Sequence, residues 1–374
     1  MMAKNPFVTS GYEGPEYFCD REEETKNLTH LLTNGNNVVL MSPRRMGKTG
    51  LLYHTFQQKE IKKAWHTFII DIYSTKNLDE LVTEMGKVML NTLQSKGERH
   101  FKKLVRTVSS LKPGLSFDAM GNPVWNVEMG TIQNPGTTLD QLFSYIEQSE
   151  RPCLVAIDEF QQIFYYPEKN VEAILRTHIQ RCHNAWFVFS GSERHLLTEM
   201  FHSPARPFYA STSTLNLESI PIEKYVEFSR AHFENAGKQL ETGTVEMIYE
   251  RFEGVTWYMQ KVLNYLYADT SVGGCCRKER VDEAVNAIVK DNSCIYADLL
   301  YQLTARQKEL LLAINREGKA AAITGSKFLK KHHLPAASSV QTTIKSLMEK
   351  QLVTHHLGVY EVYDKFFGFW LSRL

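Results

Sequence analysis

The sequence lacks a long hydrophobic run, a cysteine framework and a charge excess of either sign. No apolar stretch reaches the roughly 18 residues of a membrane-spanning helix, and the first residues have no hydrophobic core of a signal peptide. The six cysteines include no C-x-x-C pair and are too sparse for a disulfide scaffold in 374 residues. We therefore expect a cytoplasmic protein with reduced thiols and no membrane partner.

Charge is balanced over the whole chain but not along it. Lys and Arg number 43, Asp and Glu number 42, and the net charge of +1 excludes a uniformly basic nucleic-acid coat or an acidic tail. Residues 301–374 hold eleven basic and five acidic side chains, so this end carries +6 and the rest of the chain −5. A basic end on a mildly acidic body indicates a separate C-terminal module.

Short apolar runs between amphipathic helical patterns indicate an α/β fold. Buried strands are expected at 38–41, 68–72, 153–157 and 186–189, and a fifth at 215–217. Strands that alternate with helices favour a parallel sheet with helices on both faces. Alternating residues around Gly121-Asn122-Pro123 predict a β-hairpin insertion at about 105–135.

The pattern changes after the last predicted strand. Residues 1–220 are expected to form the α/β domain, and residues 221–298 read as helices separated by glycines. Three helical segments and a hairpin around Gly358 follow in residues 299–374. This order is the outline of a winged helix-turn-helix, so we expect an all-α lid followed by a winged-helix domain.

A glycine–lysine loop is the strongest chemical signal. Residues 42–49 read Ser-Pro-Arg-Arg-Met-Gly-Lys-Thr and stand between an apolar strand and a helix start. The pattern G-x-x-x-x-G-K-[ST] binds phosphates in this setting, although Ser42 stands at its first glycine. Gly47 would let the backbone approach a β-phosphate, and Lys48 would neutralise phosphate oxygens. Thr49 would place its hydroxyl on Mg²⁺, so the segment predicts ATP binding.

Two carboxylates follow a second apolar run, Leu154-Val155-Ala156-Ile157. At the end of a parallel strand Asp158 would hold Mg²⁺ through water. Glu159 would act as general base on the water that attacks the terminal phosphate. The two motifs together therefore predict a Walker-type ATPase site.

Polar residues also follow the strand at 186–189. Ser190 and Ser192, on either side of Gly191, would face the γ-phosphate and hydrogen-bond the attacking water if this strand neighbours the other two. The alternative is an ordinary turn at the end of a strand.

Five segments together carry a resemblance to a known family. In chain order they are Phe18-Cys19-Asp20-Arg21-Glu22-Glu23-Glu24, Pro43-Arg44-Arg45-Met46-Gly47-Lys48-Thr49, Ile157-Asp158-Glu159-Phe160-Gln161, Phe189-Ser190-Gly191-Ser192 and Asp364-Lys365-Phe366-Phe367-Gly368-Phe369-Trp370. The chain resembles the AAA-type ATPases described mainly from archaea, P-loop NTPases related to the STAND signalling ATPases. The double-arginine loop is the most specific part of the resemblance.

The resemblance implies an ATPase core, a helical lid, a C-terminal winged helix and a set of binding residues. The nucleotide would be held by Pro43, Arg44, Arg45, Met46, Gly47, Lys48 and Thr49, with Tyr17, Phe18 and Arg21 near the adenine. The lid segment Gly254-Val255-Thr256-Trp257 lacks the proline of the family's Gly-x-Pro. Arg206 is a candidate arginine finger, and a solvated loop arginine is the alternative.

Two functions fit these features. The first is a Mg²⁺-dependent ATPase that acts as a nucleotide-driven molecular switch. The second is an ATP-modulated DNA-binding regulator, whose recognition helix would open at Ser338 and turn Gln341 and Lys345 outward. A protein partner for the winged helix stays open, as does the oligomeric state. A small-molecule kinase is disfavoured, because the C-terminal part consists of helices and a wing.

Overall fold

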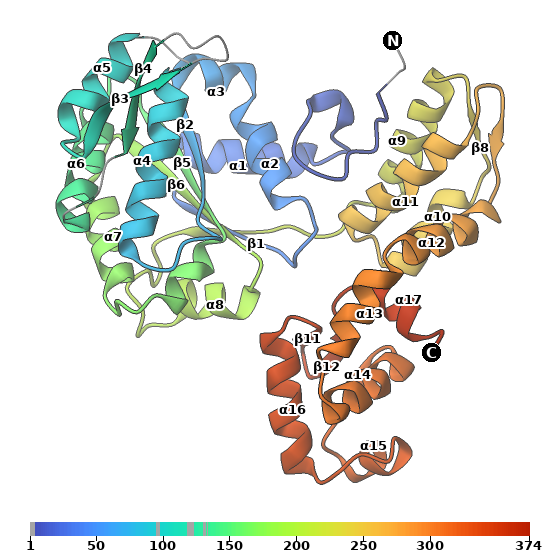
Figure 1. Ribbon diagram of the computed structural model, residues 1–374. Helices are drawn as coiled ribbons and strands as arrows, with labels where there is room; N and C mark the ends of the chain where they lie inside the picture. The colour runs from blue at the N-terminus through green and yellow to red at the C-terminus, as the bar shows by residue number, and fades with distance from the viewer. Residues whose placement is uncertain (1–3, 95–97, 118–122, 130–131, 133) are drawn as a thin grey trace. The chain divides into compact units, whose positions relative to one another are not determined.

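The computed structural model describes residues 4–94, 98–117, 123–129, 132 and 134–374 (Figure 1). These residues form two units. The sheet unit comprises Lys4–Phe228 and Glu253–Lys261, and the helical unit comprises Ser229–Phe252 and Val262–Leu374. The domain boundaries expected after residues 220 and 298 stay predictions.

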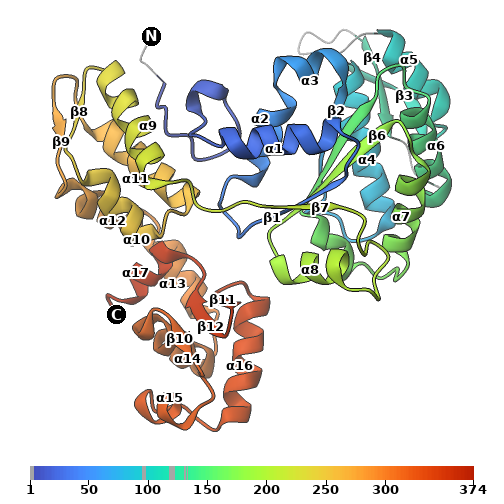
Figure 2. The same cartoon turned by 180° about the vertical axis from the view of Figure 1, so that it is seen from behind.

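The sheet unit is built on five parallel strands whose spatial order differs from their order in the chain. The strands are β1 (Val38–Met41), β2 (His66–Asp71), β5 (Cys153–Asp158), β6 (Ala185–Gly191) and β7 (Ser213–Asn216). Their order across the sheet is β2-β5-β6-β1-β7, with every pair parallel. The predicted α/β class and the fifth strand are confirmed, and Figure 2 shows β7 beside β1 at the sheet edge.

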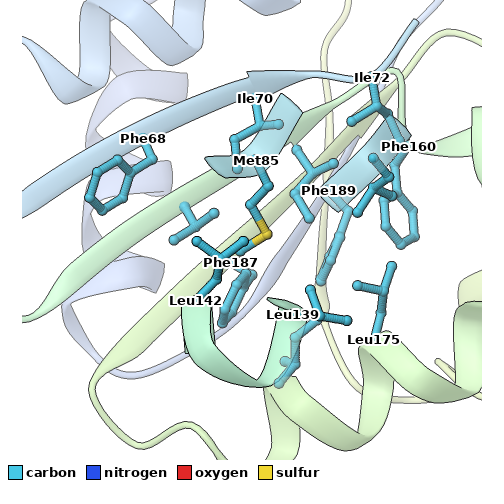
Figure 3. Packing of buried hydrophobic residues seen from close by; sticks show 14 of the residues in the cluster. Phe68, Ile70, Ile72, Met85, Leu139, Leu142, Phe160, Leu175, Phe187 and Phe189 are labelled. Atoms are coloured by element: carbon cyan, nitrogen blue, oxygen red, sulfur yellow. The ribbon is translucent and has the colours of Figure 1, made fainter. Parts of the chain in front are cut away.

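Helices cover both faces of this sheet because the strands are apolar on both sides. One core cluster joins alternate strand residues such as Val39 to α4 (Leu78–Gln94), α5 (Glu98–Thr107), α6 (Pro135–Glu147), α7 (Val171–Arg181) and α8 (Arg194–His202). Figure 3 shows Met85 of α4 and Leu142 of α6 beside Phe187 of β6 in this cluster. The other cluster lies on the opposite face of the sheet. It joins strand residues such as Val38 to α1 (Glu22–Thr33), α2 (Lys48–Phe56) and α3 (Lys59–Ala64).

Three short elements complete the sheet unit. The 3₁₀ helices η1 (Pro15–Tyr17) and η2 (Phe160–Tyr165) follow the N-terminal turns and β5, respectively. Strands β3 (Leu111–Phe117) and β4 (Pro123–Met129) pair antiparallel within the segment expected to hold the hairpin. The expected turn residues Gly121 and Asn122, with Met120 before them, lie outside the described residues.

Helices α9 (Ile222–Asn235) and α11 (Thr256–Asp269) each begin in the sheet unit and end in the helical unit. The helical unit adds α10 (Thr244–Phe252), α12 (Arg280–Asp291) and α13 (Ser293–Tyr301), with the parallel pair β8 (Gln239–Leu240) and β9 (Cys275–Cys276). These helices lie where the lid was predicted.

The winged-helix outline predicted for the C-terminal end is also present. It consists of α14 (Ala305–Glu317), β10 (Ala320–Ala321), α15 (Ser326–Lys331), α16 (Ala337–Glu349), β11 (Val353–His356) and β12 (Val359–Val362). The three strands pair in the order β10-β12-β11 (Figure 2). Thr304 starts α14 with a capping box that it shares with Gln307, which satisfies free N–H groups of the first turn.

The aromatic C-terminal end packs inside the helical unit. Asp364 caps α17 (Lys365–Leu371) by accepting hydrogen bonds from the backbone N–H groups of Phe366 and Phe367. The Phe366 ring lies 5.2 Å from that of Phe252 in α10, and the Phe367 ring lies 5.3 Å from that of Tyr296 in α13. Among the described residues, no helix is long and apolar enough to cross a membrane.

Candidate nucleotide-binding site

The strand order brings three predicted motifs to one edge of the sheet. Strand β6 lies between β1 and β5, and its register places Gly191 beside Met41 and Phe189 beside Ile157. Because all three strands run in the same direction, the segments that leave their carboxyl ends lie side by side. These segments are the 42–49 loop, the Asp158–Glu159 pair and the residues after Phe189.

The 42–49 loop has the backbone of an anion cradle. Arg45 and Gly47 have φ angles of 68° and 91°, a left-handed conformation that turns successive N–H groups toward one side. Ser42 has no positive φ, so the glycine of the usual pattern is not needed there. Its hydroxyl donates to the Pro43 carbonyl at 3.0 Å.

Lys48 is a buried cation at the first turn of α2. Its side chain is 6% exposed, and Nζ donates to the Pro43 carbonyl at 3.3 Å. Burial lowers the pKa of Lys48, while the negative charges of Glu159 and Asp158 act in the opposite direction. An ammonium that has lost most of its water is ready to bind an anion at the loop.

Thr49 and Asp158 meet directly, although 109 positions separate them. Thr49 Oγ1 donates to Asp158 Oδ2 at 2.6 Å, and the other carboxylate oxygen accepts from the backbone N–H of Glu159 at 3.0 Å. A hydroxyl and a carboxylate provide the oxygen ligands that Mg²⁺ takes in proteins, so the donor set fits this ion.

Glu159 and Ser192 are hydrogen-bonded partners, whereas Ser190 lies apart from them. Ser192 Oγ donates to Glu159 Oε2 at 2.8 Å and accepts from Arg44 Nε at 3.2 Å. Ser190 belongs to β6 itself and does not follow the strand as expected. It is fully buried, and strand alternation places it on the face of Val188, with its hydroxyl unpartnered among the described residues.

The residues expected near the adenine make contacts within the protein. The Phe18 ring stacks on His54 at 4.5 Å and leaves so little room that a Cβ on Gly50 would lie 3.2 Å from it. Tyr17 ends η1, and its ring lies 5.8 Å from Lys4 Nζ. Their role toward an adenine stays a prediction.

Arg21 joins the N-terminal segment to the 42–49 loop. It is buried, pairs with Glu24 at 2.6 Å, and donates to the carbonyls of Met46 at 3.2 Å and Glu218 at 2.6 Å. The guanidinium is therefore engaged with backbone carbonyls, and its expected place near an adenine stays a prediction.

Arg45 turns its side chain toward α11. The guanidinium lies 4.4 Å from the Trp257 ring centre and 5.1 Å from that of Tyr258, and it donates to the Tyr258 hydroxyl. Backbone contacts reinforce this attachment, since Trp257 N–H donates to the Arg45 carbonyl at 3.0 Å and Thr256 Oγ1 donates to the Met46 carbonyl at 3.2 Å. These contacts between the 42–49 loop and the start of α11 were not predicted from the sequence. There, residues 254–257 were noted only for lacking the proline of the family's Gly-x-Pro.

Arg206 is not the solvated loop arginine of the alternative interpretation. It forms an ion pair with the buried Glu172 of α7 and lies 3.7 Å from Glu199 of α8. Its guanidinium also lies 5.2 Å from the Phe164 ring centre. A role as arginine finger stays a prediction.

Two further polar residues at this edge were not assigned roles from the sequence. Gln161 donates to Glu159, and Asp71 ends β2 in register with Asp158. Desolvation raises the pKa of Asp71, and the charges of Asp158 and Glu159 act in the same direction. The sequence did hold a signal for each residue, since Gln161 stands in the motif Ile157-Asp158-Glu159-Phe160-Gln161 and Asp71 ends an apolar run. Only the strand order brings both residues to the Asp158–Glu159 pair.

Two family models match the chain. Residues 18–262 match the model of an ATPase domain predominantly from Archaea. The chain belongs to this family. Residues 294–373 match the model of a "probable winged helix domain". The expected archaeal-type ATPase with a C-terminal winged helix is thereby confirmed, and nucleotide binding follows from the family.

Solved structures share the fold of this archaeal-type ATPase. The Walker-type ATPase PABY2304 of Pyrococcus abyssi has a TM-score of 0.67 at 17% identity, with 98% of this chain and 99% of that chain covered. The ORC1 protein of Aeropyrum pernix in complex with DNA has a TM-score of 0.53 at 14% identity, with 96% and 94% covered. The ORC2 protein of the same organism in its ADP form has a TM-score of 0.54 at 14% identity, with 98% and 97% covered. No curated protein sequence matches the chain.

Proposed function

We propose that this archaeal-type ATPase hydrolyses ATP with Mg²⁺ at the 42–49 loop and acts as a nucleotide-driven switch. The observation that carries the proposal is the attachment of the loop to α11. The carbonyls of Arg45 and Met46, directly before Gly47, accept hydrogen bonds from the first residues of that helix. Helix α11 belongs to the sheet unit up to Lys261 and to the helical unit beyond it.

The chemistry is divided among four side chains. Lys48 binds phosphate oxygens, and Thr49 and Asp158 supply oxygen ligands for Mg²⁺. In the described part of the chain no group of three or more His, Cys, Asp or Glu side chains could hold a metal, so these two oxygen donors would be the ones that bind Mg²⁺. Glu159 takes a proton from the attacking water. The water oxygen bonds to the terminal phosphorus, whose bond to the bridging oxygen breaks, and ADP leaves with that electron pair.

The switch depends on a change in the peptide groups of the loop between the nucleotide-free and nucleotide-bound states. Binding of a phosphate draws the N–H groups of residues 45–48 toward it, and the carbonyls of the same peptides move with them. Because two of these carbonyls are bonded to α11, the start of the helix is held differently with and without nucleotide. Each such hydrogen bond is worth about 1 kcal/mol, which is enough to shift a two-state equilibrium several-fold.

Tryptophan emission tests this coupling. Trp257 stacks on Arg45, so its emission should change when ATP and Mg²⁺ are added to the full chain. The change should be lost in Trp257→Phe and kept in Trp370→Phe, a matched control in α17 of the helical unit. Calorimetry on the same samples measures binding separately. ATP binding without any emission change from Trp257 would contradict the switch, and no ATP binding would contradict the site.

A second candidate is a DNA-binding regulator modulated by ATP. It is supported by the local charge of +6 in residues 301–374 and by exposed Gln341 and Lys345 on α16. The structurally similar ORC1 protein has a solved structure in complex with DNA. Lys331 is less available than its neighbour Lys330, because it pairs with Glu317 at 2.6 Å.

Salt dependence separates this candidate from a winged helix that binds protein. If the full chain binds DNA, Lys330→Gln should lower the slope of log affinity against log salt by about one unit, because one phosphate contact is lost. Gln341→Ala should relax sequence preference and leave that slope unchanged. Absence of DNA binding at low salt would favour a protein partner for the winged helix.

A further inference from the structure

Glu159 uses only one of its two carboxylate oxygens in the hydrogen bonds found among the described residues. Ser192 Oγ donates to Oε2 at 2.8 Å, and Gln161 Nε2 donates to the same oxygen at 2.5 Å. Glu159 itself has a φ of 56°, so its backbone is held in a conformation that residues other than glycine rarely adopt. The backbone conformation and the two hydrogen bonds to Oε2 therefore both restrain the Glu159 side chain. Oε1 accepts none of these hydrogen bonds.

The amide of Gln161 is fixed in one orientation. The residue is 2% exposed, and its Oε1 has no hydrogen-bond partner among the described residues. Turning the amide over would bring two oxygens together at Glu159, so Nε2 faces the carboxylate. Gly191 leaves the room for Oε1 on the other side, because a Cβ there would lie 2.1 Å from it. The serine–glycine–serine segment therefore accommodates this glutamine.

Arg44 determines the direction of the Ser192 hydrogen bond. A hydroxyl has one proton to donate, and Ser192 Oγ accepts from Arg44 Nε at 3.2 Å and, more weakly, from Gln161 Nε2 at 3.5 Å. The hydroxyl proton consequently points to Glu159. This chain of bonds joins the 42–49 loop to Glu159 through the residue that follows β6.

We propose that Gln161 and Ser192 are positioning residues that hold Oε2 of Glu159 and leave Oε1 as the oxygen that takes the proton of the attacking water. The inference rests on the proposed hydrolysis and adds the residues that orient its base. The bonds made and broken at phosphorus are those given above, and the proton ends on Oε1. Among the described residues, the charged groups that interact with Glu159 are Lys48 and Asp71. Asp158 precedes it in the chain, Arg44 is bonded to its partner Ser192, and none of these groups is changed in the test.

The test compares two isosteric variants of adjacent glutamines in the full chain. Gln161→Glu puts a second carboxylate against Glu159 in place of a donor. Gln162→Glu makes the same change one residue away, where Nε2 instead donates to the Thr75 carbonyl at 3.1 Å. The measurements are the pH profile of kcat, the KM for ATP and the ATP affinity from calorimetry.

We expect the acid limb of the kcat profile to move upward by at least about one pH unit in Gln161→Glu, because two carboxylates that share a site do not ionise together. In Gln162→Glu the limb should stay in place. ATP affinity should stay within about twofold of the wild type in both, since neither side chain belongs to the 42–49 loop. An acid limb that moves equally in both variants, or in neither, would overturn the inference.

A second variant covers the case in which Gln161→Glu does not fold. Gln161→Met keeps the length and removes the donor, so the carboxylate loses a hydrogen bond to its charged form. The acid limb should again rise, by about one unit. A fall in kcat without movement of the limb would assign Gln161 a merely structural role and refute the proposal. Failure of the proposed function looks different, because the wild type itself would then show no ATP turnover.

Discussion

Replacing Lys48 by methionine removes the buried cation of the 42–49 loop and keeps the length of its side chain. Lys48 is 6% exposed as a whole residue, and its ammonium has the Pro43 carbonyl as a neutral acceptor at 3.3 Å. A hydrogen bond from such a charged group is worth roughly 1.5–3 kcal/mol. Lys48→Met should therefore weaken ATP binding by about tenfold to a hundredfold.

The same variant should not weaken the fold in the absence of nucleotide. Burial lowers the pKa of Lys48 below 10.5, so the folded chain holds this proton less tightly than the unfolded chain. The free energy of unfolding of the wild type should then rise with pH between the lowered pKa and 10.5. Lys48→Met should lack this contribution.

Calorimetry with ATP and Mg²⁺ at pH 7 measures the first effect, and urea unfolding at several pH values measures the second. Lys26→Met is the matched control, because Lys26 is 67% exposed on α1 and pairs only with Glu23 at 3.2 Å among the described residues. It should leave ATP affinity unchanged. If Lys48→Met binds ATP within twofold of the wild type, the assignment of this loop to phosphate binding is refuted.

Three further predictions concern the base and the helical unit. Glu159→Gln keeps the shape of the side chain but cannot take a proton. ATP should still bind, while turnover in a coupled assay should fall about 100-fold or more. Unchanged turnover would exclude Glu159 as the base. Hydrogen bonds from Lys331 and His332 lower the pKa of Glu317, so its contribution to stability is present above pH 4.5 and is lost as pH falls through the lowered value. Glu317→Gln should remove that step from the acid-unfolding curve, and an unaltered curve would contradict the linkage. Phe366→Ala should lower the free energy of unfolding by about 3–5 kcal/mol in urea titrations, since the ring is 1% exposed, and a loss below 1 kcal/mol would contradict the packing of α17.

Much of the site could be predicted because its signals are local. Gly47, Lys48 and Thr49 stand in a strand–loop–helix setting that a few consecutive residues determine. Asp158 and Glu159 likewise end an apolar run that reads as a buried strand without any knowledge of its neighbours. The family pattern added the N-terminal and C-terminal segments. Backbone periodicity and motif spacing therefore sufficed for the fold class and for proposing which residues bind phosphate and Mg²⁺.

The direction of the other side chains could not be predicted from such patterns. Arg45 and Arg21 were both expected at the nucleotide, and that role stays a prediction. No pattern indicated that Arg45 stacks on Trp257 or that Arg21 binds the carbonyls of Met46 and Glu218. Partners this far apart in the chain become neighbours only after the N-terminal segment and α11 pack against the loop. A sequence pattern lists the guanidinium groups but does not show which carbonyl or ring each one will meet.

The sequence by itself determined that three motifs follow three buried strands, and the tertiary structure decided how these strands lie next to one another. Strand β6 comes late in the chain but lies between β1 and β5, so Ser192 can contact both Arg44 and Glu159. The orientation of Gln161 depends on the space that Gly191 leaves beside it. Strand order and side-chain space result from packing of the whole sheet unit, since each apolar run could pair with any other until both faces of the sheet are covered.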